Sequence, residues 1–201
     1  MTYATPFNPI DRSDHCSVVL NGKLLVAGGM GWIGHQILLN DVWSSTDGLV
    51  WENLNASPVF SGRSAMGCAL HQSQVVLVGG YDGSLGNDVW ITSTGSSWSL
   101  SGTGNFSGRE YHGVVSFQDK LWVVGGWDGR DPNADLNDVW YSTTLSDGFS
   151  AATHSAGFPA RRAFGLTAYH GKLWIAAGWG SGAPLQGVWI FVGLSEEQRD
   201  G

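Results

Sequence analysis

The sequence predicts an all-β fold made of repeated antiparallel sheets. Of the 201 residues, 30 are Gly and 11 are Trp, whereas only 13% are charged. Glycine weakens helices and permits tight turns, and Trp favours pleated, half-buried surfaces, so a mainly helical fold is excluded. A unit of about 50 residues also occurs four times along the chain. Composition and repetition together therefore point to four similar sheets.

Each copy of the unit begins with an arginine, and a pair of small residues follows at a fixed distance. The arginines are Arg12, Arg63, Arg109 and Arg161, and the pairs are Gly28-Gly29, Gly79-Gly80, Gly125-Gly126 and Ala177-Gly178. The tetrapeptide Asn-Asp-Val-Trp comes next, at residues 40–43, 87–90 and 137–140, and the fourth copy has Gln186-Gly187-Val188-Trp189 instead. A period of this length is typical of propellers and solenoids.

Four short strands are expected in each copy. Asn21-Gly22 lies between two apolar runs and is a strong signal for a two-residue hairpin. The first two strands are almost continuously apolar, as in strands buried between stacked sheets. The third contains Asp-Val-Trp, and the fourth, near Trp51 or Trp98, is more polar. Because one such sheet cannot bury both faces, the sheets are expected to pack radially as blades of a β-propeller.

With these elements the sequence resembles the kelch-repeat family. The initial arginine, the double glycine that ends the second strand and the paired aromatics of the outer strands carry the resemblance, which covers residues 12–192. It implies a kelch-type β-propeller of four-stranded antiparallel sheets, with four blades per chain. The expected blades are residues 12–54, 63–101, 109–150 and 161–192, followed by a polar tail at 195–201.

The fourth copy lacks an aromatic outer strand. Residues 2–7 parallel the segments that precede Arg63 and Arg109, and we expect them to supply the missing strand and so protect the sheet edge. Three assemblies fit this pattern: a closed four-blade monomer, a homodimer that completes a larger propeller, and a part of a longer protein. The monomeric ring is the simplest of the three.

Charge and hydropathy exclude several function classes. The net charge is −7 and no basic run occurs, so binding to a nucleic-acid backbone is not expected. Apolar runs such as residues 24–27 are too short to cross a membrane. No signal peptide is visible, and the two cysteines, Cys16 and Cys68, allow one bridge or none, so a soluble, acidic, cytoplasmic protein is expected. No phosphate-binding loop, Cys-x-x-Cys or nucleophile elbow occurs, and no cofactor is expected.

Aromatic residues recur directly after the small pairs. They are Tyr81, Trp127 and Trp179, with Met30 at that position in the first copy and Trp32 two residues further on; Asp82 and Asp128 follow the first two. Fourfold repetition would array them as a collar around one mouth of the axial channel. Aromatic faces beside carboxylates suit sugars or cationic groups. The alternative is that each ring covers the glycine turn of its own blade.

The four arginines also permit two interpretations. In kelch adaptor proteins, arginines near the axial mouth bind acidic peptides through forked hydrogen bonds, and the resemblance implies that role for Arg12, Arg63, Arg109 and Arg161, with Tyr111 nearby. Alternatively, each arginine pairs with a carboxylate or carbonyl of the neighbouring blade. Because all four copies carry the residue, the structural role is favoured.

Two histidines follow arginines by three residues. In a four-blade ring, His15 and His112 would face each other, and Asp11, Asp14 and Glu110 lie nearby in sequence. Such a group suits proton transfer or metal binding, although packing at the channel entrance is favoured and no metal site is assigned.

Two functions remain. The leading one is a binding module for a peptide, protein or glycan. The alternative is a small-molecule enzyme, similar to kelch-like sugar epimerases or metal-assisted, with mouth His, Arg and Asp residues as acid and base.

Overall fold

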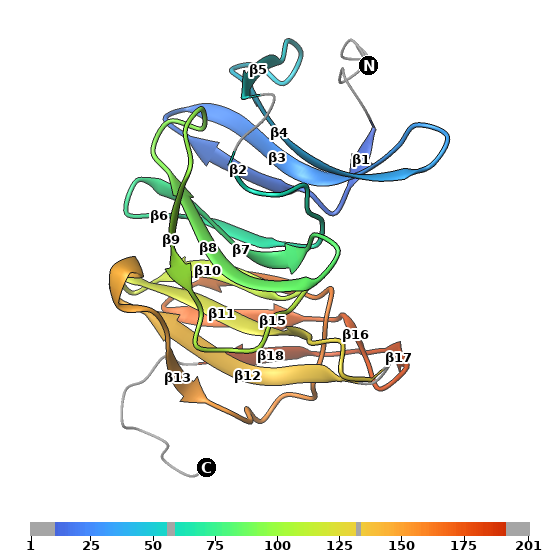
Figure 1. The fold of residues 1–201 in the computed structure, drawn as a ribbon. Coiled ribbons are helices and arrows are strands. Elements are labelled where there is room, and N and C mark those ends of the chain that lie inside the picture. The colour runs from blue at the N-terminus through green and yellow to red at the C-terminus, as the bar shows by residue number, and fades with distance from the viewer. Residues whose placement is uncertain (1–10, 56–58, 132–133, 192–201) are drawn as a thin grey trace.

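The computed structural model describes residues 11–55, 59–131 and 134–191. They form four antiparallel sheets that follow one another in chain order, each packed on the next (Figure 1). The predicted four-blade, kelch-type propeller arrangement is confirmed. The expected closing strand at residues 2–7 and the polar tail at 195–201 lie outside the described residues. Within these residues, no helix has the length and apolar character needed to span a membrane.

The second and third blades have the same order of four strands, and the first and fourth are variants of it. The first contains β1 (Arg12–Ser13), β2 (Cys16–Leu20), β3 (Lys23–Trp32), β4 (Gln36–Ser45) and β5 (Glu52–Asn55). The second contains β6 (Gly67–His71), β7 (Gln74–Tyr81), β8 (Leu85–Thr92) and β9 (Ser99–Thr103). The third contains β10 (Gly113–Phe117), β11 (Lys120–Trp127), β12 (Asp135–Ser142) and β13 (Ser150–Thr153), with the 3-10 turn η1 (Leu145–Asp147). The fourth contains β14 (Gly165–Tyr169), β15 (Lys172–Ala176) and β18 (Val188–Phe191), beside a small ribbon of β16 (Trp179–Gly180) and β17 (Ala183–Pro184).

The outermost strands β9 and β13 begin directly after a buried aromatic residue. Trp98 and Phe149 belong to the apolar cores, and Ser99 and Ser150 follow them as the first paired residues of the two strands.

The first hairpin of each blade has the predicted geometry. Asn21 and Gly22 both have positive φ, of 51° and 77°, as a two-residue turn between right-twisted strands requires. The pairs Gln72-Ser73, Gln118-Asp119 and His170-Gly171 adopt the same conformation without an Asn-Gly sequence. The repeat therefore sets these turns as strongly as the local residues do.

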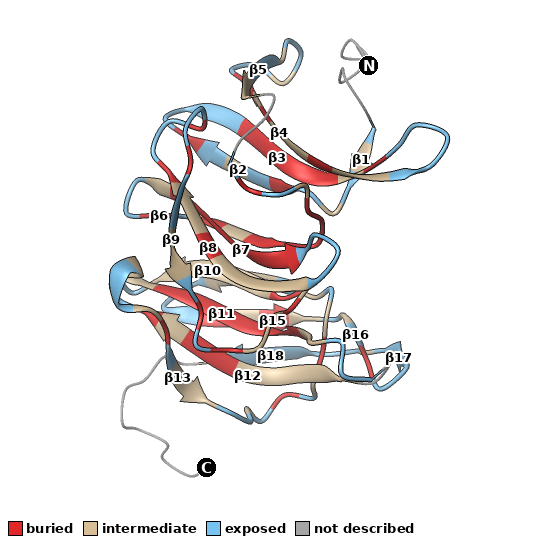
Figure 2. Ribbon diagram, viewed as in Figure 1, coloured by how far each residue is buried: buried red, intermediate tan, exposed pale blue. Residues whose placement is uncertain are grey.

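Three apolar cores lie between consecutive blades. The central strands β3, β7 and β11 contain the longest buried runs, as Figure 2 shows in red. Cys16 on β2 and Cys68 on β6 form a disulfide across the first of these interfaces, with Cα atoms 5.8 Å apart. The sequence left this bridge open, and the structure contains it.

Inner-strand glycines mark where the next blade packs. A Cβ atom on Gly67 would lie 2.2 Å from Val114 of the third blade, and one on Gly113 would lie 2.5 Å from Leu166 of the fourth. The equivalent Cβ on Gly165 would meet only Ala176 of its own blade, at 3.7 Å or more. Among the described residues, no further blade therefore packs on this face of the fourth blade.

Candidate functional site

Backbone hydrogen bonds join the blades around one mouth of the axis. The residues two positions after the arginines are Asp14, Ala65, Tyr111 and Ala163, and all have φ between 51° and 55°. Ala65 donates its N–H to the carbonyl of Asp14, Tyr111 to that of Ala65, and Ala163 to that of Tyr111, each at 2.9 Å. We call these four residues the mouth arc. Left-handed conformations are uncommon outside glycine, and the bonds between blades compensate for them here.

The predicted collar lies on the same face as the mouth arc. Each residue directly after an arginine pairs with the residue directly after a small pair: Ser13 with Met30, Ser64 with Tyr81, Glu110 with Trp127, and Arg162 with Trp179. The repeat therefore places these eight residues at one end of the propeller, where side chains from neighbouring blades meet.

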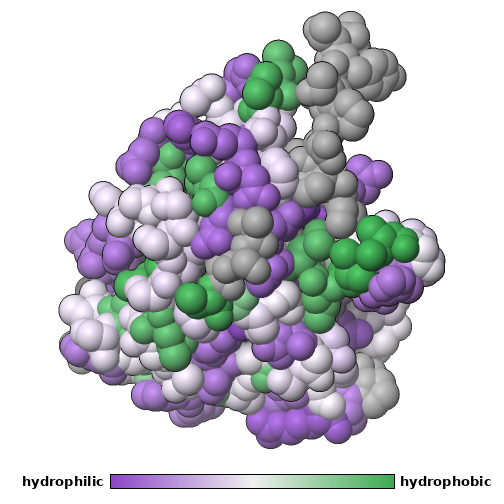
Figure 3. Space-filling model, turned by 45° about the horizontal axis from the view of Figure 1, so that its top comes forward, coloured by the Kyte–Doolittle hydropathy of each residue, from purple (hydrophilic) through white to green (hydrophobic). Residues whose placement is uncertain are grey.

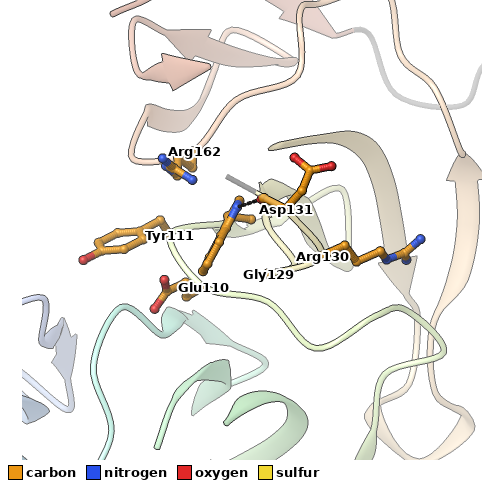
Figure 4. A pocket seen from close by; sticks show the side chains of 7 residues that line it. Glu110, Tyr111, Gly129, Arg130, Asp131 and Arg162 are labelled. Carbon is orange, nitrogen blue, oxygen red and sulfur yellow. Dashed lines mark hydrogen bonds between the residues drawn. The ribbon is translucent and has the colours of Figure 1, made fainter. Parts of the chain in front are cut away.

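A pocket of about 700 Å³ opens at this end between the third and fourth blades (Figure 4). Its lining residues are Glu110, Tyr111, Trp127, Gly129, Arg130, Asp131 and Arg162. The indole N–H of Trp127 donates to the carbonyl of Asp131 at 2.9 Å, which fixes the ring. The guanidinium carbon of Arg162 lies 5.4 Å from the centre of the Trp127 ring, within the range of a cation–π contact.

The pocket contains charges of both signs. Burial raises the pKa of Glu110, the nearby charge of Arg162 opposes this, and Asp14 adds to it. Burial also raises the pKa of Tyr111, and its hydroxyl makes a long contact of 3.5 Å to Asp14 of the first blade. Arg162 also lies 3.4 Å from the carboxylate of Asp135. The pocket thus contains two aromatic rings, the partly buried carboxyl group of Glu110 and the guanidinium group of Arg162, which Asp135 helps to position.

The structure brings only some of the predicted ligand residues together. Tyr111 and Trp127 line the pocket, and Asp128 lies beside it in an ion pair of 2.7 Å with Arg130. Tyr81 and Trp179 lie on the same face without lining this pocket.

Trp32 and Asp82 lie at other blades. Trp32 is 69% exposed and lines a second hollow of about 460 Å³ on the first blade, together with Arg12. Asp82 accepts a hydrogen bond of 2.6 Å from Ser61 and lies 3.8 Å from Arg63. Burial raises its pKa, but the hydrogen bonds from Ser61 and Ser84 and the charge of Arg63 together lower it by more.

Three of the four arginines are held inside their own blades. Arg12, Arg63 and Arg109 form forked pairs with Asp41, Asp88 and Asp138 respectively, with shortest N–O distances of 2.7 Å. The Trp of the same tetrapeptide donates to the same carboxylate in each case, from Trp43, Trp90 and Trp140. The expected carboxylate partner therefore comes from the same blade and not from the neighbouring one.

The backbones of Arg63, Arg109 and Arg161 make the link to the preceding blade instead. Gly29, Gly80 and Gly126 donate to the carbonyls of Arg63, Arg109 and Arg161, at 2.8 to 2.9 Å. Close backbone approach at these glycines leaves no room for a side chain, since a Cβ on Gly80 would lie 2.6 Å from the carbonyl oxygen of Ser64.

Neither candidate histidine lines the pocket. His112 is buried beside Gly67 and Gly126, where burial and the charge of Arg109 lower its pKa to about 3, against a smaller contribution from the backbone of Val78. His15 lies at the surface next to Gly29, and partial burial and Arg12 lower its pKa. The described part of the chain contains no group of three His, Cys, Asp or Glu residues arranged to hold a metal ion.

Sequence reasoning missed Arg162, Arg130 and Asp131 as pocket residues. A signal for Arg162 was present, because it occupies the repeat position of Ser13, Ser64 and Glu110, directly after the motif arginine. Arg130 and Asp131 belong to the loop after the third small pair. The equally long loop of the first copy has Ile33 and Gly34 at these places, so the repeat gave no guide to them.

The comparison with protein families agrees with this geometry. The family model for the kelch motif matches residues 11–44 and 108–141, which cover the arginine-to-Trp core of the first and third blades. The chain is a kelch-repeat β-propeller. A search of curated proteins finds no match. The second blade has the strand order of the third, and the fourth blade is joined to the third by the same hydrogen bond from Gly126 to the arginine carbonyl. Kelch propellers commonly serve as protein-interaction modules.

Proposed function

We propose that this kelch propeller is a binding module that holds a peptide segment of a partner in the pocket between the third and fourth blades. The observation that carries the proposal is the pairing of Trp127 with Arg162 across the junction of two blades. A rigid aromatic ring in a concave site is the usual anchor of an interface. No second function is proposed, because neither His15 nor His112 lines the pocket.

The charges favour a peptide over a glycan. Glu110 and Arg162 are groups of opposite charge type within one pocket. The site therefore matches a polypeptide, which offers donors, acceptors and charged groups together. A neutral glycan would use the Trp127 face equally well but would leave the partly buried carboxyl of Glu110 and the guanidinium of Arg162 with hydroxyl partners only. Glycan binding is therefore the second outcome that the experiment must detect.

The disulfide bears on where binding takes place. Bridges such as Cys16–Cys68 persist in oxidising compartments and are rare in the cytosol. We therefore place the binding function in an oxidising environment, in place of the cytoplasm expected from the sequence.

The test uses a displayed random-peptide library and a glycan array, each applied to the intact chain. Enriched peptides are expected, and Trp127→Ala should weaken their binding at least tenfold. Trp179→Ala is the matched control, since Trp179 has the same repeat position outside the pocket, and it should leave binding unchanged. Peptides that bind Trp127→Ala as well as the original chain would disprove the site, and enrichment of glycans alone would replace the peptide by a sugar ligand.

A further inference from the structure

The fourth blade retains its motif arginine but lacks the aspartate that accepts from it. Gly187 stands where the other blades have Asp41, Asp88 and Asp138. The Arg161 side chain is fully buried, with Nε donating to the carbonyl of Pro159 and Nη1 to that of Ala177. Its Nη2 has no hydrogen-bond partner among the described residues, whereas Nη2 of Arg109 donates to Asp138 at 2.8 Å.

The second donor to the missing carboxylate is also present. Trp90 and Trp140 each donate an indole N–H to the aspartate of their blade, and Trp189 occupies the same repeat position. A Cβ atom on Gly187 would have a single neighbour within 4 Å, the indole nitrogen of Trp189 at 3.9 Å. The space directly around this Cβ position is therefore open and lies beside a donor, and Gly187 and Trp189 are both exposed there.

The outer edge of the fourth blade is open as well. Within the described residues β18 pairs with β15 alone, whereas the third strands of the other blades also pair with β5, β9 or β13. Val188 and Ile190 on this edge are 61% and 48% exposed. On the face that Figure 3 shows, apolar side chains lie in several separate patches. An exposed apolar strand edge is a template for pairing with another strand.

A hollow beside β18 matches one aromatic ring. In the second blade the ring of Phe60 packs edge to face against Trp98, and in the third blade Phe106 packs in the same way against Phe149. The ring centres are 5.2 Å apart in both pairs. Phe158 is the equivalent residue for the fourth blade, and it lines a hollow of about 140 Å³ together with residues of β18. A cavity of about 150 Å³ is large enough to hold a benzene ring.

We infer that the open edge of the fourth blade binds an extended partner peptide that carries an aromatic residue and, five residues later, a glutamate. The peptide pairs with β18, its ring fills the hollow against Phe158, and its carboxylate accepts from Arg161 and Trp189. Strand addition supplies backbone hydrogen bonds, and the buried guanidinium supplies the charge that selects an acidic partner.

The spacing follows from the second blade. There Ile91 pairs with Ser99 and Asp88 pairs with Thr103, and Trp98 directly precedes the first of these partners. Gly187 directly precedes β18, so a peptide that keeps this register places the fifth residue after the aromatic one beside Gly187. Side chains of directly opposed residues point to the same face of a sheet, so a glutamate at that place can extend into the open space beside Gly187. This surface is separate from the mouth pocket, and the two proposals fail independently.

The probe is a capped peptide with the sequence of residues 97–104 of this chain and the change Thr103→Glu. Control peptides carry Thr103→Gln, or Trp98→Ala in addition to Thr103→Glu. Binding to the intact chain is measured by calorimetry and by the indole N–H resonance of Trp189. The glutamate peptide should bind at least tenfold more tightly than the glutamine peptide, and the peptide without Trp98 should bind at least tenfold more weakly than its parent.

Protein variants complete the test. Trp189→Phe keeps the ring and removes the donor, and it should reduce the preference for glutamate about fivefold, whereas the matched control Trp90→Phe in the second blade should leave it unchanged. Equal binding of the glutamate and glutamine peptides would overturn the inference. Absence of binding would overturn it too. The variant Ala4→Pro removes a backbone N–H from residues 2–7, the segment expected from the sequence to supply this strand. If the peptide binds only to that variant, the edge belongs to residues 2–7 of the chain itself and the inference is wrong.

Discussion

Arg109 and Asp138 form a forked ion pair inside the third blade, with N–O distances of 2.7 and 2.8 Å. The arginine side chain is fully buried, and its Nη1 also donates to the carbonyl of Gly125. The pair therefore ties the start of the kelch motif to the double glycine and to the Asn-Asp-Val-Trp strand. Removing one partner would leave an uncompensated charge in the blade, which costs more than the pair itself contributes.

Asp138→Asn is therefore expected to lower the free energy of unfolding by about 3 kcal/mol. Arg130→Gln is the matched control, because Arg130 is 73% exposed and Asp128 keeps its hydrogen bonds from Ser107 and from the backbone N–H of residue 130, so it should cost less than about 1 kcal/mol. Urea denaturation followed by Trp fluorescence measures both. Equal losses for the two variants would show that the buried pair is not the stronger constraint.

Gly67→Ala is expected to destabilise the fold by about 1–3 kcal/mol, because its new methyl group would overlap Val114 of the next blade. Gly165→Ala should be tolerated, since its Cβ would meet only Ala176 at 3.7 Å or more. Thermal unfolding of both variants gives the comparison. A large loss in Gly165→Ala would mean that another blade covers this face in solution.

His112→Met is expected to remove part of the loss of stability in acid. The folded-state pKa of His112, about 3, lies below the ordinary value of 6.5, so the unfolded chain takes up the proton first as the pH falls. The contribution of His112 is thus present above pH 6.5 and declines below it, by about 1.4 kcal/mol per pH unit. Met is suitable because Met66 fills the same repeat position. Denaturation curves between pH 7 and pH 4 that stay parallel for both proteins would contradict the assignment.

Loss of the Cys16–Cys68 bridge is expected to lower stability by about 2–4 kcal/mol, since the bridge closes a separation of 52 residues between two blades. The double variant Cys16→Ala/Cys68→Ala should unfold at lower urea concentration and lose its response to reducing agent. If dithiothreitol leaves the original chain unchanged in the same assay, the bridge does not contribute to the fold.

The repeated features of the fold were predictable because the same signal recurs in each copy. The arginines, the small pairs and the hairpin at Asn21-Gly22 have a fixed register, and each has a local physical role. The disulfide was not predictable to the same degree, because it depends on how β2 and β6 align across two blades. Sequence spacing allowed the bridge without requiring it.

The candidate site was predictable only in part. Trp127 and Tyr111 follow from their repeat positions, but the pocket forms where they meet Arg162 of the next blade. That meeting depends on the packing of the third blade against the fourth, which no local pattern records. The role of Gly187 was equally hidden, since a missing carboxylate has meaning only beside the buried Arg161.

In the mouth arc, the hydrogen bonds that join the blades do not depend on the side chains at the same positions. Its three bonds between blades use main-chain atoms alone, and the four side chains are an acid, an alanine, a phenol and another alanine. A change of side chain at one of these positions therefore alters the mouth without altering the bond that sets the blade. Selection, or a protein engineer, can vary the recognition surface one repeat at a time while the architecture stays constant.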